Sequence, residues 1–128
     1  MEPLQRILMV EDESDIQAVA RLALEAVGGF TVHMCASGFD ALKDAPAFGP
    51  DLILLDVMMP GMDGPGTLRA LRQTPETARV PVVFMTAKVQ PQEVASLKEL
   101  GALGVIAKPF DPMTLSSTIQ QIWAERHG

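Results

Sequence analysis

The sequence predicts an α/β domain with a doubly wound, five-stranded parallel sheet and five helices. Short apolar runs alternate along the chain with stretches whose apolar residues recur at helical spacing. The central runs lack polar alternation, which is typical of parallel strands covered by helices on both faces. Alternating strands and helices joined by right-handed crossovers favour the doubly wound arrangement.

The most informative run lies at residues 52–55, where four aliphatic residues follow one another. Asp56 ends this run, and Pro60-Gly61 soon afterwards interrupts regular structure. A carboxylate at the carboxyl end of a buried strand lies where open α/β sheets bind their ligands. On this stretch alone, Asp56 could equally well cap a turn.

The N-terminal part of the chain predicts a strand and a long helix. Residues 6–10 form a short apolar run that stops at the acids of residues 11–13. Ser14 and Gln17 have the spacing of a capping box, with Ser14 as the N-cap. The helix should end at Gly28-Gly29. Its expected apolar stripe consists of Ile16, Val19, Ala20, Ala23, Leu24 and Val27.

A second strand and a short helix follow. Residues 30–35 predict a strand whose inward side chains include Val32 and Met34, which leaves His33 solvated on the other side. Ser37 can cap a helix that continues to Ala45. The apolar residues expected on this helix are Phe39, Ala41 and Leu42.

The second half repeats the pattern after the central strand. A helix should start at residues 63–65, with Leu68 and Leu71 on its apolar face. Residues 81–86 and 104–108 predict buried strands, and residues 91–100 predict the helix between them. Asp111 followed by Pro112 resembles an N-cap with proline at the first helical position. The last helix should carry Leu115, Ile119 and Ile122 and run to the C-terminus.

Length and composition indicate a single cytoplasmic domain. The 128 residues show no linker or repeat, so we expect one domain over residues 1–128 without an output domain. The net charge of −6 disfavours direct binding to nucleic acid or to an anionic membrane. Cys35 is the single cysteine, which excludes an internal disulfide and fits a reducing compartment. The sequence contains neither a signal peptide nor an apolar run of membrane-spanning length.

Polar residues follow four of the predicted strands and should meet at one edge of the sheet. Carboxylates that lie together attract a hard divalent cation, and Mg²⁺ prefers oxygen ligands. A carboxylate can also attack phosphorus, with a lysine and a hydroxyl to bind the phosphoryl oxygens. Taken one by one, such residues more often lie in solvated turns or surface loops. They are Glu11 and Asp12 after the first strand, Asp56 after the third, Thr86 after the fourth and Lys108 after the fifth.

Nearly the whole chain resembles a response-regulator receiver domain of two-component signalling. The motifs behind the resemblance are Glu11-Asp12, Asp56 with residues 59–64 after it, Thr86-Ala87 and Lys108-Pro109-Phe110. The resemblance implies a flavodoxin-like strand order of 2-1-3-4-5. It further implies a switch, not an enzyme, that is phosphorylated with Mg²⁺ by a histidine kinase or phosphotransfer protein. The downstream target would bind the surface of the fourth helix, fifth strand and fifth helix.

The resemblance also implies a role for each site residue. Asp56 would be the phosphoacceptor, and Thr86 and Lys108 would bind the phosphoryl oxygens. The expected Mg²⁺ ligands are Asp12, Asp56, the backbone carbonyl of Met58 and, through water, Glu11. A cis peptide bond is expected between Lys108 and Pro109, although only about 5% of X–Pro bonds in folded proteins are cis.

Residues at three positions predict how the signal is transmitted and how long the phosphoryl group persists. The family often places a switch aromatic three residues before the lysine, but this chain has Val105 there. Signalling through an aromatic flip is therefore not expected. Met58 and Lys88 stand two residues after Asp56 and Thr86, where they would flank the water that hydrolyses an aspartyl phosphate. Neither side chain can act as a base, since Met58 is apolar and Lys88 is protonated, so we expect slow loss of the phosphoryl group.

Two other classes of protein remain as alternatives. A pseudo-receiver binds partners without phosphorylation, but such modules usually lack a key residue and none is missing here. A phosphohydrolase of the haloacid dehalogenase type would need a second aspartate at the position of Met58. A P-loop nucleotide enzyme is excluded because the sequence has no G-x-x-x-x-G-K-[ST] stretch.

Overall fold

The computed structural model describes residues 3–126 and contains, within them, one five-stranded parallel sheet in the order β2-β1-β3-β4-β5. The predicted fold class and strand order are confirmed. The sequence also predicts a frayed end at His127, next to the last residue, but His127 lies outside the described residues. The strands are β1 (Arg6–Val10), β2 (Thr31–Cys35), β3 (Leu52–Asp56), β4 (Val82–Thr86) and β5 (Gly104–Ala107). The helices are α1 (Ser14–Arg21) with η1 (Leu22–Val27), α2 (Gly38–Phe48), α3 (Gly64–Arg72), α4 (Pro91–Glu99) and α5 (Leu115–Glu125).

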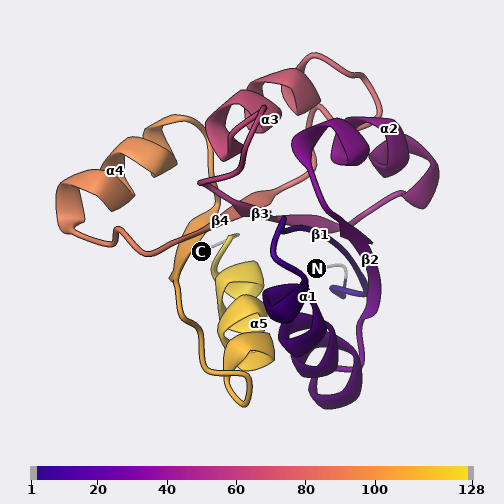
Figure 1. The fold of residues 1–128 in the computed structure, drawn as a ribbon, viewed down its shortest axis with the longest axis vertical. Helices are drawn as coiled ribbons and strands as arrows, with labels where there is room; N and C mark the ends of the chain where they lie inside the picture. Colours follow the sequence, from indigo (N-terminus) through magenta and orange to yellow (C-terminus); the bar gives the residue numbers. More distant parts are fainter. Residues whose placement is uncertain (1–2, 127–128) are drawn as a thin grey trace.

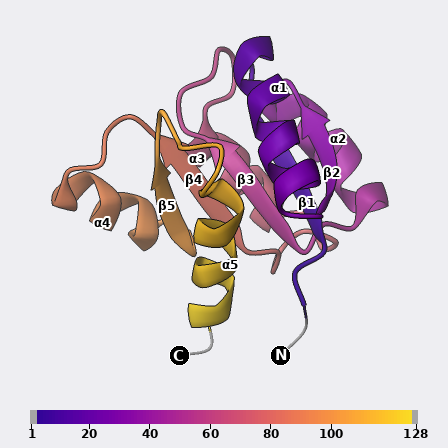
Figure 2. The same ribbon diagram turned by 90° about the horizontal axis from the view of Figure 1, so that it is seen from below.

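The sheet forms the middle layer between two groups of helices. Helices α1 and α5 cover one face, and α2, α3 and α4 lie on the other (Figure 1). The view in Figure 2, turned by 90°, shows α1 and α5 side by side across the strands. Alternate strand residues point to opposite faces. Ile7 and Met9 therefore pack towards α1 and α5, whereas Leu8 and Val10 pack towards α2 and α3.

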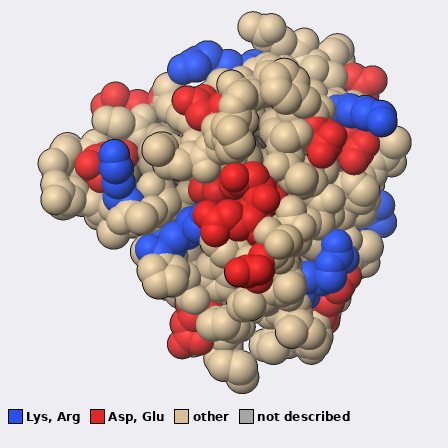
Figure 3. Space-filling view, viewed as in Figure 1, with Lys and Arg blue, Asp and Glu red and all other residues tan. Residues whose placement is uncertain are grey.

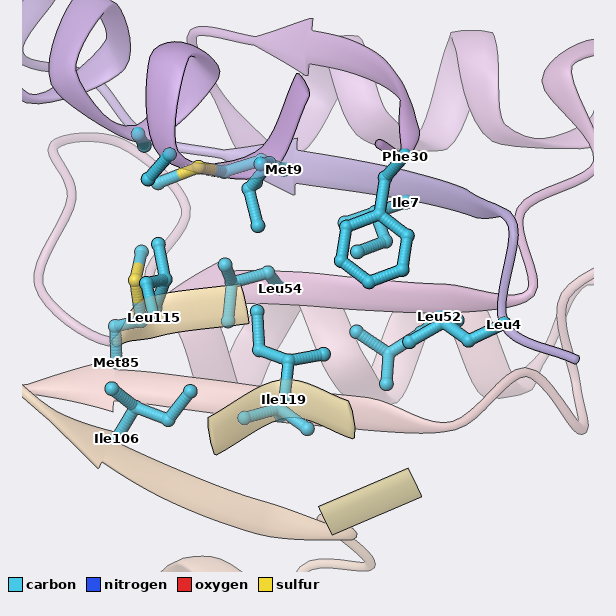
Figure 4. Close-up of a cluster of buried hydrophobic side chains, with 14 of the residues drawn as sticks. Leu4, Ile7, Met9, Phe30, Leu52, Leu54, Met85, Ile106, Leu115 and Ile119 are labelled. Carbon is cyan, nitrogen blue, oxygen red and sulfur yellow. The ribbon is translucent and has the colours of Figure 1, made fainter. Parts of the chain in front are cut away.

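The core on the α1 and α5 face consists of aliphatic side chains from several strands. Figure 4 shows Met9, Leu54 and Met85 from the sheet facing Leu115 and Ile119 from α5. All five are at most 1% exposed. Burial of this kind stabilises a domain by roughly 25 cal/mol for each Å² of apolar surface. The rigid sheet thereby provides a platform for residues at the strand ends.

The first helix differs from its prediction. Ser14 is the first helical residue and Glu13 is the N-cap, so the predicted capping box is wrong. From Leu22 to Val27 the helix widens into a π-helix, and the N–H of Gly28 donates to the carbonyl of Ala23 five residues earlier. The wider turn rotates the apolar stripe. Val19, which precedes this turn, and Val27, which ends it, are 41% and 52% exposed and do not join the core, whereas Ala20, Ala23 and Leu24 are buried as predicted.

Helix α2 is longer than predicted. It continues past Ala45 to Phe48, and Gly49 in the left-handed conformation ends it. Ser37 is the N-cap, as predicted, and its hydroxyl accepts a hydrogen bond from the N–H of Asp40. Phe39 is 57% exposed and does not join the core.

The structure also differs from the prediction at the end of β5 and at the start of α5. The strand ends at Ala107, one residue before Lys108. Asp111 is not the N-cap, because its side chain accepts from the N–H of Met113 and closes a separate turn. The helix then begins three residues later than predicted, at Leu115, with Thr114 as its N-cap.

Helices α3 and α4 are anchored very differently. The N-cap Asp63 of α3 accepts from the N–H of Gly66 at 2.8 Å, and Leu68 and Leu71 are buried. Among residues 91–99 of α4, all of which the structure describes, none is buried. Within residues 3–126, each helix is too short or too polar to cross a bilayer.

Candidate functional site

The carboxyl ends of the parallel strands bring the predicted polar residues to one edge of the sheet. Carboxylate oxygens of Glu11, Asp12 and Asp56 all lie within 4.8 Å of one another. Lys108, directly after β5, reaches into this group from the other side of β3 and β4. Figure 3 shows acidic side chains gathered near the middle of the molecular face, over the region of β1 and β3. We call Glu11, Asp12, Asp56 and Lys108 the acidic pocket.

Lys108 connects two buried carboxylates of the acidic pocket. Its Nζ lies 3.0 Å from Oε1 of Glu11 and 3.1 Å from Oδ2 of Asp56. Glu11 is 0% exposed and Asp56 is 3% exposed, whereas Asp12 is exposed. One lysine therefore balances part of the charge of three neighbouring acids, and Asp12 leaves the pocket open to solvent.

Burial and charge act in opposite directions on these groups. Burial raises the pKa of Glu11, and the neighbouring charge of Asp56 adds to that, although hydrogen bonds from Glu13 and Lys108 oppose it. Burial alone would lower the pKa of Lys108, but its hydrogen bonds to Glu11 and Asp56 outweigh burial and leave the pKa raised. The cluster contains three carboxyl groups and one ammonium group, so its residues carry more acidic than basic groups.

Two residues that the sequence analysis did not assign to the site hold Glu11 in place. The N–H of Glu13 donates to Oε2 of Glu11 at 3.0 Å. The side-chain Nε2 of Gln17 donates to the backbone carbonyl of Glu11 at 2.5 Å. Gln17 was predicted to cap its own helix, so its true partner is the segment that carries the acids. Only the tertiary structure reveals this contact.

The loop after Asp56 depends on a close backbone approach by Gly64. The N–H of Gly64 donates to the carbonyl of Val57 at 2.9 Å. A Cβ atom at Gly64 would lie 2.5 Å from the carbonyl oxygen of Asp56, closer than any side chain tolerates. Met58 lies in the same loop, and its N–H points to Oδ1 of Asp56 at 3.4 Å. Its side chain is 68% exposed.

Thr86 and Lys88 lie beside the acidic pocket at the end of β4. Thr86 is 4% exposed, and its Oγ1 accepts a hydrogen bond from the N–H of Lys88 at 3.0 Å. The Lys88 side chain is exposed and lines, together with Thr86 and Val57, a hollow that extends to α4. Both residues are therefore on the same side of Asp56 as α4.

The remaining predicted positions lie on β5 and in the loop after it. Val105 is half-buried and pairs with Phe84 across β4 and β5. The peptide bond between Lys108 and Pro109 is cis, as the resemblance implied. Pro109 and Phe110 line an apolar hollow with Ile16 and Val19 of α1.

The arrangement suits a hard divalent cation and a phosphoryl group. Three acids within 4.8 Å offer the oxygen ligands that Mg²⁺ prefers. The ammonium group of Lys108 and the hydroxyl group of Thr86 are donors that can bind phosphoryl oxygens. A carboxylate in this setting can act as a nucleophile towards phosphorus.

Comparisons with known proteins lead to the same family. A sequence model of the response regulator receiver domain matches residues 7–120. The transcriptional regulatory protein CseB of Streptomyces coelicolor is 36% identical over 116 residues, which make up 91% of this chain and 48% of that protein. The transcriptional regulatory protein PhoP of Bacillus subtilis is 36% identical over 118 residues, 92% of this chain and 48% of that protein. The chain thus spans about half the length of these curated relatives.

The fold has close structural relatives as well. The chemotaxis response regulator CheY4 of Vibrio cholerae matches with a TM-score of 0.85 and 31% sequence identity. The match covers 94% of this chain and 99% of that one. The structure of this chemotaxis response regulator is therefore superimposable on nearly the entire chain.

Proposed function

The chain belongs to the response regulator receiver family, the phosphoacceptor modules of two-component signalling, and we propose that Asp56 is its phosphoacceptor. Receiver domains interact with histidine kinases, and the phosphoryl donor proposed here is a histidine kinase or a phosphotransfer protein. The observation that carries this assignment is the buried Asp56 carboxylate, 3.1 Å from Lys108 Nζ at the end of the central strand. Glu11 and Asp12 complete the setting of this carboxylate.

The proposed reaction transfers a phosphoryl group between two side chains. A carboxylate oxygen of Asp56 attacks the phosphorus atom of a phosphohistidine. The bond between phosphorus and the imidazole nitrogen breaks, and the nitrogen keeps the bonding electron pair. Lys108 Nζ, already beside Oδ2 of Asp56, provides positive charge where phosphoryl oxygens arrive. The buried hydroxyl of Thr86 is the second proposed donor to these oxygens.

The proposed direct ligands of Mg²⁺ are Asp12, Asp56 and the backbone carbonyl of Met58. Glu11 would bind the ion through water. When bound, the ion neutralises charge on the transferring phosphoryl group. Glu11 is held for this role by the N–H of Glu13 and by Lys108. Removing Lys108 should change the phosphorylated state more than the affinity for Mg²⁺, because Lys108 pairs with acids and cannot bind a cation.

Phosphorylation would shift the domain between two conformations. The modification adds a charge of about −1.5 to −2 beside Lys108 and Thr86. Thr86 and Lys88 line a hollow shared with α4, and Val105 lies in β5 behind that helix. We therefore propose that the surface of α4, β5 and α5 contacts the downstream target. With Val105 at the switch-aromatic position, the signal would travel through α4 and not through a ring flip.

Met58 and Lys88 are proposed to set how long the phosphoryl group persists. Met58 lies next to Asp56 in the loop after β3, and its apolar side chain cannot orient a water molecule. Lys88 is held beside Thr86 by its backbone and carries a cationic side chain. Neither can serve as a base, so slow autodephosphorylation is expected.

The test is incubation with Mg²⁺ and acetyl phosphate, read by intact mass. We expect the mass of one added phosphoryl group, lost upon chelation and in Asp56→Asn. Asp40→Asn serves as a matched control, because Asp40 is an exposed acid on α2 outside the acidic pocket. Labelling of Asp56→Asn at the rate of the unmodified protein would exclude Asp56. A protein that binds its partner but is never labelled would instead be a pseudo-receiver.

A further inference from the structure

A second cluster of metal-ligating side chains lies between β2 and α2, away from the acidic pocket. His33 and Cys35 are two residues apart on β2, so their side chains project from the same face of the strand. Helix α2 packs on that face and places Asp44 over both of them. The imidazole nitrogen, the thiol sulfur and a carboxylate oxygen all lie within 4.8 Å of one another.

We propose that His33, Cys35 and Asp44 bind a Zn²⁺ ion, with the fourth position left to water. Imidazole, thiolate and carboxylate are the three ligand types that zinc uses in proteins. In a tetrahedral site, nitrogen and oxygen ligands lie about 3.3 Å apart, and sulfur and oxygen ligands about 3.6 Å apart. Here His33 Nε2 is 2.9 Å and Cys35 Sγ is 3.9 Å from Oδ2 of Asp44. Shifts of a few tenths of an ångström would give the tetrahedral geometry.

The cluster is accessible from one side and supported on the other. Cys35 is 2% exposed and forms the floor, whereas the side chains of His33 and Asp44 are 40% and 36% exposed. The His33 ring packs on Phe48 with 5.3 Å between ring centroids, and the Arg6 guanidinium covers Phe48 at 4.2 Å. These contacts orient the imidazole and lower the entropy lost when a metal binds.

The two clusters of this protein should prefer different cations. Burial raises the pKa of the Cys35 thiol to about 12, and the charges of Asp44 and Asp40 add to that. A bound cation must displace this thiol proton, which Zn²⁺ can do because it binds thiolate strongly. Mg²⁺ prefers oxygen ligands and should remain at Glu11, Asp12 and Asp56.

The experiment uses Co²⁺ as an optical probe, with Mg²⁺ in excess to fill the acidic pocket. One equivalent of Co²⁺ should produce a thiolate-to-cobalt charge-transfer band in the near ultraviolet, and one equivalent of Zn²⁺ should remove it. Cys35→Ser should abolish the band, and His33→Gln and Asp44→Asn should each weaken binding at least tenfold. The control Asp12→Asn should keep the band, because Asp12 belongs to the other cluster.

Circular dichroism would establish that each variant is folded. Absence of the band at one equivalent of Co²⁺ in the unmodified protein would overturn the proposal. A band that survives Cys35→Ser, or that disappears in Asp12→Asn, would do the same. The cluster would then be a hydrogen-bonded His33–Asp44 pair above a buried thiol. These outcomes do not depend on whether Asp56 is phosphorylated.

Discussion

The middle of the sheet and its carboxyl edge are equally buried but chemically opposite. Leu54 in the middle of β3 and Glu11 at the edge are both 0% exposed, and Asp56 is 3% exposed. Leu54 is surrounded by apolar side chains of the core (Figure 4). Glu11 and Asp56 instead share a single ammonium group. Equal burial therefore has opposite consequences for the free energy of folding.

The difference shows that the apolar middle of the sheet supplies the folding free energy that the carboxyl edge, with its buried carboxylates, does not. Burying an aliphatic side chain is favourable, whereas burying a carboxylate requires compensation by pairing. The raised pKa of Glu11, due first to burial, indicates that the compensation is incomplete. Removal of a buried leucine should therefore destabilise the protein, whereas removal of a buried carboxylate charge at the edge should stabilise it.

The largest effect is expected from Leu54→Ala. Removal of a fully buried leucine leaves a cavity, and we expect the free energy of unfolding to fall by about 2–5 kcal/mol. Urea denaturation followed by circular dichroism measures this change. A loss below about 1 kcal/mol would mean that the middle of the sheet is not the stabilising region.

The next largest loss of stability is expected from Lys108→Ala, which changes only the carboxyl edge of the sheet. It leaves Glu11 and Asp56 without their shared cation, so we expect a loss of about 2 kcal/mol, discounted because the Lys108 side chain is 16% exposed. Added Mg²⁺ should restore part of the loss in urea denaturation. The exposed Lys43→Ala is the control and should change stability by no more than about 0.5 kcal/mol. Equal losses in the two variants would contradict the comparison.

Glu11→Gln should stabilise the protein by about 1 kcal/mol at neutral pH in the presence of a chelator. A raised pKa in the folded state means that stability falls as the pH rises from the unfolded value of 4.5 through the folded pKa. The gain from Glu11→Gln should therefore be complete above this window and disappear below pH 4.5. Urea titrations at several pH values test this. A gain that does not depend on pH would exclude the ionisation of Glu11 as its cause.

Met58→Asn and Lys88→Glu should have the smallest effect on stability. Both side chains are exposed, so we expect changes within about 0.5 kcal/mol. Each should nevertheless shorten the lifetime of the phosphoryl group severalfold, because each introduces a group that can orient water. Decay is followed by intact mass after removal of the donor. Fast decay in the unmodified protein, or decay unchanged by both substitutions, would show that other residues set the lifetime.

Periodic features of the sequence predicted the fold and the proximity of the site residues. Apolar runs identified each strand, and parallel strands bring Glu11, Asp56 and Lys108 to one edge. Individual contacts between residues far apart in the sequence could not be predicted. Lys108 and Glu11 are 97 residues apart, and their bond depends on tertiary packing. Gln17 fitted a capping box equally well, and only the fold shows that it binds the carbonyl of Glu11.

The prediction that His33 is simply solvated holds only in part, because its side chain is 40% exposed but also contacts Asp44 and Phe48. Strand periodicity correctly placed it opposite Val32, but periodicity does not show what covers that face. Helix α2 extends beyond Ala45 and brings Asp44 and Phe48 over the strand. The π-helix from Leu22 to Val27 was not predicted either, because the apolar spacing of this segment is that of an ordinary amphipathic helix.

The shallow packing of helix α4 should affect how fast its amide hydrogens exchange with solvent. None of residues 91–99 is fully buried, although Leu97 packs partly against the core, and Gln90 at the N-cap adopts an extended backbone before Pro91. A helix attached in this way can open locally at a free energy well below that of global unfolding. The amide hydrogens of α4 should exchange with solvent much faster than those of α3, whose Leu68 and Leu71 are buried in the core. The helix beside Thr86 and Lys88 can therefore rearrange while the sheet stays intact.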